Sequence, residues 1–117
     1  MRALIIVDIQ NDFVKGGALA VNEGEQIIPL ANSLMPNFDL VVATQDYHPE
    51  GHGSFAQVPD DIGTLVDLNG LDQVLWPVHC VEETFGSKFV DGLEVDRFDK
   101  IIRKGTDPKI DSYSGFF

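Results

Sequence analysis

The sequence is poor in cysteine, histidine and basic residues. Its 117 residues include one cysteine and three histidines, and eight Lys and Arg stand against 19 Asp and Glu, for a formal net charge of −11. A single cysteine excludes an internal disulfide and fits a reducing compartment. The acidic balance argues against nucleic acid or an anionic membrane as a partner, because such surfaces recruit Lys and Arg. No segment has the length of a membrane span or of a signal-peptide core, so we expect a cytoplasmic protein.

Three short apolar runs predict the strands of an α/β fold. Residues 3–9 form a run rich in Ile and Val, apolar except for Asp8 near its end, as expected of a strand that is covered on both faces. Residues 40–44 and 101–103 are expected to be the second and third strands. A helix between the first two strands gives a β-α-β unit with a right-handed crossover, and hence a parallel sheet. A chain of this length is one domain at most.

The helix between the first two strands is predicted from a capping pattern. Residues 22–25 (NEGE) resemble a capping box, with Asn22 as the cap. Apolar residues then follow at helical spacing over 27–35. Pro29 fits only if the helix begins a few residues after the cap, so that the proline lies in the first turn. Residues 51–70 show no such spacing and are expected to be mostly irregular.

Polar side chains stand where the three predicted strands end. Asp8 closes the first run, Asp46 and His48 close the second, and Lys104 closes the third. In open α/β sheets, ligands gather just outside the carboxyl ends of the strands. If the strands are parallel neighbours, these four side chains reach one rim of the sheet and share one crevice.

Asp46 and His48 also have the spacing of a metal site. In extended backbone, residues two apart leave on the same face, and imidazole with carboxylate suits zinc, iron or manganese. His79 is the natural third ligand, and a set of two His and one Asp with open positions is typical of a catalytic site. His52 is either a fourth ligand or a loop histidine that is hydrogen-bonded nearby. The alternative interpretation is a turn cap at Asp46, a surface histidine at 48 and a polar core network around His79.

Five motifs, taken in order, resemble those of nicotinamidases. They are 7–13 (VDIQNDF), 44–49 (TQDYHP), 52–55 (HGSF), 76–81 (WPVHCV) and 103–105 (RKG). Nicotinamidases are isochorismatase-like cysteine hydrolases, and the resemblance runs from residue 1 to residue 117. It implies a doubly wound parallel sheet, with residues 1–117 as the N-terminal portion of a single hydrolase domain. It also implies hydrolysis of nicotinamide in NAD salvage, with pyrazinamide as an additional substrate.

The resemblance further implies roles for particular side chains. Asp8 and Lys104 would belong to a Cys-Asp-Lys triad, in which Asp8 moves the proton and Lys104 favours the thiolate. The divalent metal would be held by Asp46, His48 and His79. Phe13 and Trp76 would flank the pyridine ring. Without the resemblance, Asp8 reads as a strand-end cap, Lys104 as a solvated charge and the two aromatic residues as core packing.

The nucleophile of that triad is expected downstream of the sequence. In the family it lies at a helix N-terminus in a motif resembling TDYCV, and residues 112–117 (SYSGFF) end before such a motif. Cys80 is a poor substitute, because in extended backbone it points to the face opposite His79, so we expect a buried and inert thiol. The first strand would lack a neighbour on one side. Such an apolar edge invites a second copy of the chain or a complementing C-terminal segment.

Two hypotheses of different classes therefore remain. In the first, the chain is the N-terminal part of a nicotinamidase whose cysteine lies outside residues 1–117. In the second, it is a truncated and inactive remnant that binds metal or regulates. A hydrolase that uses metal-activated water is a weaker third hypothesis, because an open site of two His and one Asp supports that chemistry.

Overall fold

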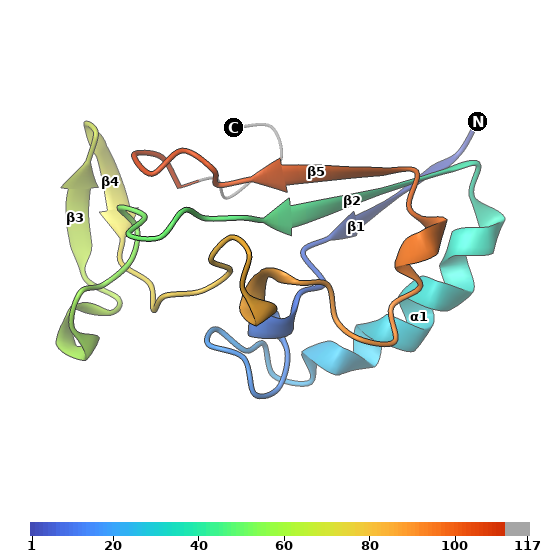
Figure 1. The fold of residues 1–117 in the computed structure, drawn as a ribbon, viewed down its shortest axis with the longest axis horizontal. Coiled ribbons are helices and arrows are strands. Elements are labelled where there is room, and N and C mark those ends of the chain that lie inside the picture. The colour runs from blue at the N-terminus through green and yellow to red at the C-terminus, as the bar shows by residue number, and fades with distance from the viewer. Residues whose placement is uncertain (112–117) are drawn as a thin grey trace.

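The computed structural model describes residues 1–111, and its centre is a parallel sheet with the strand order β1-β2-β5 (Figure 1). The strands are Ala3–Val7 (β1), Leu40–Asp46 (β2) and Lys100–Lys104 (β5). β2 lies in the middle, where Ala43 is paired with Ile6 of β1 and with Ile101 of β5. The α/β fold class, the parallel sheet and all three predicted strands are confirmed.

A single α-helix among residues 1–111, α1 (Ile27–Leu34), connects β1 to β2. The predicted capping box at Asn22 is wrong. The chain instead enters the helix through a 3-10 turn, Gly24–Gln26, and no side chain caps either element. Pro29 falls in the first turn, as predicted, where its missing N–H leaves no hydrogen bond unmade. In this part of the chain, no helix is both long enough and apolar enough to cross a bilayer.

The hydrophobic core lies on one face of the sheet, between the strands, α1 and the segment 89–98. Its buried members come from β1, β2, the helical segment 27–37 and the chain just after β1 and around residue 93; they are Ile6, Ile9, Ala31, Met35, Val41, Ala43 and Leu93. The opposite face of β1 is open, since Ile5 and Val7 are 60% and 61% exposed. The expectation that β1 is covered on both faces is therefore wrong for the described residues, which supply a cover for one face only.

A β-hairpin stands apart from the sheet at one end of the molecule (Figure 1). It is formed by β3 (Leu65–Leu68) and β4 (Leu71–Val74), which pair antiparallel. Its two-residue turn is Asn69-Gly70, with φ of 53° and 83°, as a type I′ turn requires. The expectation of irregular structure over 51–70 is wrong for this part, although the Asn-Gly pair was a signal for a hairpin.

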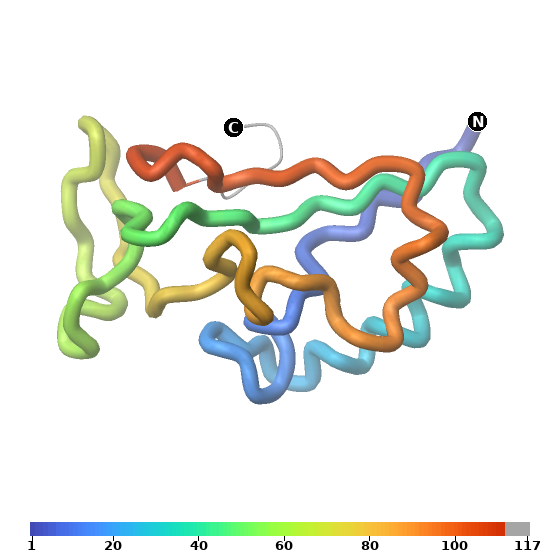
Figure 2. The backbone as a smooth tube through the Cα atoms, in the orientation of Figure 1, coloured from blue at the N-terminus to red at the C-terminus, as the bar shows by residue number. Residues whose placement is uncertain are grey.

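Long loops bring distant segments together beyond the carboxyl ends of β1 and β2. Figure 2 shows the segment after β1 running beside the segment around residue 88. Gln10 forms an antiparallel bridge with Phe89, and the Asn11 N–H donates to the Lys88 carbonyl at 2.9 Å. The loop after β5 is fixed in a similar way, because the Gly53 N–H donates to the Pro108 carbonyl at 2.8 Å. These loops and the ends of the strands carry the side chains of the candidate site.

Candidate active site

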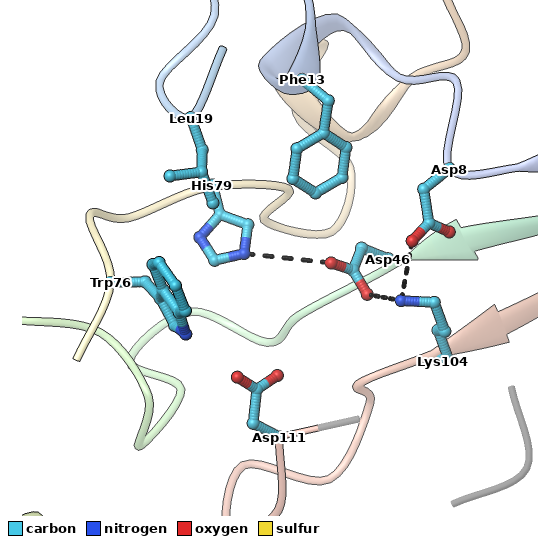
Figure 3. Close-up of a pocket in the computed structure, with 8 residues that line it drawn as sticks. All are labelled: Asp8, Phe13, Leu19, Asp46, Trp76, His79, Lys104 and Asp111. Atoms are coloured by element: carbon cyan, nitrogen blue, oxygen red, sulfur yellow. Dashed lines mark hydrogen bonds and ion pairs between the residues drawn. The ribbon is translucent and has the colours of Figure 1, made fainter. Parts of the chain in front are cut away.

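The ends of the three parallel strands are joined by ion pairs through Lys104. Its Nζ lies 2.8 Å from Asp8 Oδ2 and 2.5 Å from Asp46 Oδ1, so one ammonium serves two carboxylates (Figure 3). Asp8 Oδ1 also accepts a hydrogen bond of 2.7 Å from the Thr44 hydroxyl. The rim of the sheet thus brings together Asp8, Asp46 and Lys104, as predicted for parallel strands that lie side by side.

Asp8 reaches this position because the chain turns sharply out of β1. Its φ is 53°, in the left-handed region, which costs a residue with a Cβ about 1–2 kcal/mol. Asp is one of the few side chains that tolerate this conformation. The turn ends β1 and directs the following loop across the end of the sheet.

His48 and His79 are oriented by hydrogen bonds to the backbone. Nδ1 of His48 donates to the Gly105 carbonyl at 2.8 Å, and Nδ1 of His79 donates to the Pro77 carbonyl at 2.7 Å. Because the carbonyls are acceptors only, these bonds place a proton on Nδ1, and each ring in its neutral form then has its lone pair on Nε2. The two Nε2 atoms lie 3.5 Å and 3.9 Å from Asp46 Oδ2.

This trio has the chemistry of a cation site. The three potential ligand atoms lie within 4.8 Å of one another, and all three residues are buried. His48 Nε2 is buried and has no hydrogen-bond partner. Three acceptors that face one another without a donor repel, and a buried polar atom without a partner is costly. A divalent cation would satisfy all three, so Asp46, His48 and His79 fit the metal site that the sequence suggests.

The charges around Asp46 shift the pKa values of its neighbours. Burial would raise the pKa of Asp46, but interactions with His48 and Lys104 outweigh burial and hold it below its usual value. Burial would lower the pKa values of His48 and Lys104, but the Asp46 carboxylate raises both above their usual values. His79 is different, since burial holds its pKa below the usual value. The carboxylate, the ammonium and a neutral His79 are therefore all favoured near neutral pH.

His52 lies next to this trio but has other partners. Its ring centroid is 4.5 Å from that of His48. Nε2 donates to the Ile110 carbonyl at 3.1 Å, while Nδ1 accepts from the Ser54 N–H at 3.1 Å and lies 2.8 Å from the Ser54 hydroxyl. With both ring nitrogens engaged, His52 fits the second reading of the sequence, a loop histidine that is hydrogen-bonded nearby.

A pocket of about 190 Å³ opens beside these charges (Figure 3). It is lined by residues from every loop at the rim: Asp8, Phe13, Leu19, Asp46, Trp76, His79, Lys104 and Asp111. The Phe13 ring is 5.8 Å from the His79 ring, and Trp76 projects into the same space (Figure 3). All of the residues to which the resemblance assigns a role line one pocket except His48, which is fully buried.

Cys80 is close to the site in sequence but does not line the pocket. Its thiol is fully buried, with Sγ 3.9 Å from the Gly86 carbonyl. Burial, together with the Asp46 charge and other nearby carboxylates, raises the pKa of this thiol far above its usual value. The assumption of extended backbone was wrong, since Cys80 has a φ of 49°. The expected buried and unreactive thiol nevertheless agrees with these surroundings.

Three polar side chains that contribute to the site were not found from the sequence. Gln10 is fully buried and bonds to the backbone of Asp46. Asp12 Oδ2 accepts the Cys80 N–H at 2.8 Å, which fixes the loop that carries His79. Asp111 lines the pocket and accepts a hydrogen bond of 3.1 Å from Gln73 of the hairpin. No local pattern marks such residues, because their partners are distant in sequence.

Comparison with known protein families shows which family the chain belongs to. The isochorismatase domain matches residues 2–115. The chain belongs to the isochorismatase family. Its three-stranded parallel sheet matches part of the fold of similar solved structures.

Similar proteins within the family are nicotinamidases and pyrazinamidases. The nicotinamidase of Escherichia coli (strain K12) is 44% identical over 121 residues, which cover 99% of this chain and 57% of the relative. A nicotinamidase/pyrazinamidase structure from Acinetobacter baumanii is 43% identical with a TM-score of 0.90, covering 97% of this chain and 56% of that one. The pyrazinamidase of Pyrococcus horikoshii, solved in complex with zinc, is 44% identical with a TM-score of 0.74, covering 97% and 57%. The isochorismatase-family chain thus spans a little over half the length of these relatives.

Proposed function

We propose that residues 1–117 are the N-terminal portion of a single nicotinamidase domain. The whole enzyme would hydrolyse nicotinamide to nicotinate and ammonia, and would act on pyrazinamide in the same way. The observation that carries this proposal is the meeting of the Asp8–Lys104 ion pair and the Asp46, His48 and His79 trio at one pocket. The names of the relatives, nicotinamidase and pyrazinamidase, point to the same substrates.

The proposed reaction passes through a thioester. An amide is a poor electrophile with a poor leaving group, and a covalent intermediate divides one difficult step into two easier ones. A cysteine thiolate attacks the carboxamide carbon. The C–N bond then breaks, and the amide nitrogen takes up a proton and leaves as ammonia. Water then cleaves the thioester to release the acid and the thiol. In this scheme the thiol belongs to a part of the enzyme outside residues 1–117.

Asp8 and Lys104 supply the proton chemistry in this proposal. Asp8 takes the proton of the attacking thiol and passes it to the departing nitrogen, as a general base and then a general acid. Lys104 favours the thiolate by its charge, and its contact with Asp8 of 2.8 Å holds the two groups together. The second contact of Lys104, with Asp46, connects this pair to the proposed metal ligands.

The trio of Asp46, His48 and His79 would hold a divalent metal, for which zinc, iron and manganese are the candidates. Bound there, such an ion would supply a fixed positive charge able to take the lone pair of a pyridine nitrogen. A zinc complex of the Pyrococcus horikoshii relative favours zinc. Phe13 and Trp76 would flank the flat ring of the substrate, where aromatic stacking favours a planar heterocycle over an aliphatic amide.

An open sheet edge gives a place for a complementing segment. The free edge of β1 is bordered by a groove of about 520 Å³, lined mainly by apolar residues that include Val7, Ile9, Val21, Ile27 and Leu30. Ile27 and Leu30 are 48% and 56% exposed, and a free edge with apolar neighbours favours addition of a strand. We propose that the remaining part of the domain covers this groove, with a second copy of the chain as the alternative occupant.

The proposal includes a cytoplasmic location and a small-molecule substrate. The single cysteine, which is buried and has no second cysteine within residues 1–117 for a disulfide, suits a reducing compartment. The comparisons give no support to the alternative of an inactive remnant.

The test is ammonia release from nicotinamide in the presence of zinc, for the 117-residue chain and for the complete domain. We expect release by the complete domain only, loss of release in Asp8→Asn, and full release in Cys80→Ser. Each variant is checked by circular dichroism, so that loss of activity is separated from loss of fold. Release by the short chain that disappears in Cys80→Ser would make Cys80 the nucleophile. If the complete domain folds but releases no ammonia, the proposed amidase activity is wrong.

A further inference from the structure

β1 ends before β2 does, and this leaves the end of β2 without a strand partner on the β1 side, although β5 pairs with it on the other side. The pairing of the two strands continues until the Asp8 N–H donates to the Thr44 carbonyl at 3.2 Å. In a regular parallel ladder, the Asp46 N–H would next donate to the Asp8 carbonyl. That carbonyl instead accepts the Gln10 N–H at 2.9 Å, because the chain turns away at Asp8.

The side chain of Gln10 takes the place of the missing backbone. Its Oε1 accepts the Asp46 N–H at 2.8 Å, and its Nε2 donates to the Asp46 carbonyl at 2.8 Å. Both backbone groups of Asp46 on this side are therefore satisfied by one amide, which has the same donor and acceptor as a peptide group. The Gln10 side chain is fully buried, so water offers no substitute.

The same amide connects Asp46 to the loop that follows His79. Gln10 Nε2 also donates to the Ser87 carbonyl at 2.8 Å. The Gln10 backbone forms a bridge with Phe89, which fixes the amide from behind. Gln10 therefore ties the backbone of one proposed metal ligand to the loop that leads away from another.

We propose that Gln10 is a positioning residue for the metal site, acting by holding the backbone of Asp46 where β1 no longer supports it. The inference rests on the proposed role of Asp46, His48 and His79 as metal ligands. Groups that hold metal ligands in place typically contribute 10–100-fold, in order of magnitude, to metal affinity. Without the Gln10 amide, the Asp46 N–H and C=O remain buried without partners, and the Asp46 carboxylate loses its fixed position relative to the two Nε2 atoms.

Gln45 offers a matched control within the same buried layer. It is 6% exposed, its Nε2 donates to the same Ser87 carbonyl at 2.8 Å, and its Oε1 accepts from Arg103 Nε at 3.2 Å. Its side-chain amide makes none of these bonds to the backbone of Asp46. A methionine at either position keeps the length of the side chain and removes the amide, so the two variants differ mainly in whether Asp46 is supported.

The experiment compares Gln10→Met and Gln45→Met in the full chain, with Co²⁺ as the probe. Affinity is measured by titration, and the ligand field is followed through the d–d absorption bands of bound Co²⁺. Urea unfolding gives the stability of each variant. We expect Gln10→Met to weaken Co²⁺ binding by about 10–100-fold and to alter the absorption bands. Gln45→Met is expected to keep both the affinity and the bands, even where its loss of stability is similar.

Each outcome decides between positioning and general stability. Equal loss of Co²⁺ affinity in the two variants, in proportion to their loss of stability, would overturn the proposal while leaving the metal site intact. Unchanged bands and affinity in Gln10→Met would also overturn it. If the unsubstituted chain binds no Co²⁺, then the metal site itself fails, and with it the role of Gln10. Should Gln10→Met not fold, Gln10→Glu serves instead, because it keeps an acceptor for the Asp46 N–H and replaces the donor to the Asp46 carbonyl with a carboxylate oxygen.

Discussion

Lys104 and Asp8 form an ion pair across the end of the sheet, with Nζ 2.8 Å from Oδ2, although their strands are not neighbours. β2 lies between them, and its last residue, Asp46, makes the second contact of Lys104. The side chains of the pair are only 9% and 18% exposed, so water screens this interaction weakly. One cation therefore compensates two carboxylates at the centre of the candidate site.

Replacement of this cation should destabilise the fold. In Lys104→Met, two poorly solvated carboxylates lose their counter-charge, and breaking a buried ion pair in this way costs about 3–5 kcal/mol. Urea unfolding in the presence of a chelator measures the change. Lys100→Met is the control, since Lys100 lies exposed at the other end of β5 and a surface substitution changes stability by about 0.5 kcal/mol at most. A similar loss in both variants would contradict the special position of Lys104.

The same charges predict how stability depends on pH in the metal-free chain. The pKa of Asp46 is lowered below its ordinary 3.8, so its contribution is present above that value and is lost as the pH falls through the lowered pKa. The pKa of Lys104 is raised above its ordinary 10.5, so its contribution is present below that value and is lost as the pH rises through the raised pKa. The free energy of unfolding should therefore fall in acid and again in strong base. In Lys104→Met, the free energy of unfolding should fall less in strong base. An unchanged fall would contradict the assigned contribution of the Lys104 ammonium.

Zinc should stabilise the chain through the trio of Asp46, His48 and His79. A ligand that binds only the folded state adds about 2.7 kcal/mol at a concentration 100 times its dissociation constant. We therefore expect a rise in melting temperature with zinc, and its reversal by a chelator.

Variants of the histidines separate the trio from its neighbour. His79→Gln should lose the zinc-dependent rise, because it removes one of the three ligand atoms. His52→Gln should retain it, because the bonds of His52 go to Ser54 and Ile110. A loss of zinc stabilisation in folded His52→Gln as great as in His79→Gln would make His52 a ligand.

Cys80 should be unreactive in the folded chain. Its thiol is buried, and burial with nearby negative charges raises its pKa, so little thiolate is exposed near neutral pH. Iodoacetamide should leave the native chain unmodified and should add one group in urea, as measured by intact mass. Rapid modification of the native chain would show that the thiol is accessible.

The sheet and its rim could be predicted because their signals are local. Apolar runs mark β1, β2 and β5, and the polar residues that follow each run, such as Asp8 and Lys104, must then meet if the strands are parallel. The open face of β1 could not be predicted, because the same apolar run suits a strand covered on one face or on two.

The parts that were missed or wrongly predicted have three different causes. The hairpin Leu65–Val74 carries a recognisable Asn-Gly turn, which outweighs the weak alternation of its strands. Gln10 has no such signal, because its partner Asp46 is 36 residues away and a buried glutamine looks like any other in the sequence. The prediction of a capping box was wrong because a 3-10 turn at Gly24–Gln26 takes the place of the first helical turn.

The hairpin is connected to the pocket by the side-chain amide of Gln73, which donates to Asp111 at 3.1 Å. Asp111 lines the pocket, whereas the hairpin lies outside the sheet and its core. Substitutions in the hairpin can therefore move one carboxylate of the pocket while the strands keep their packing. The position of a negative charge in the pocket can thus be changed from outside the hydrophobic core.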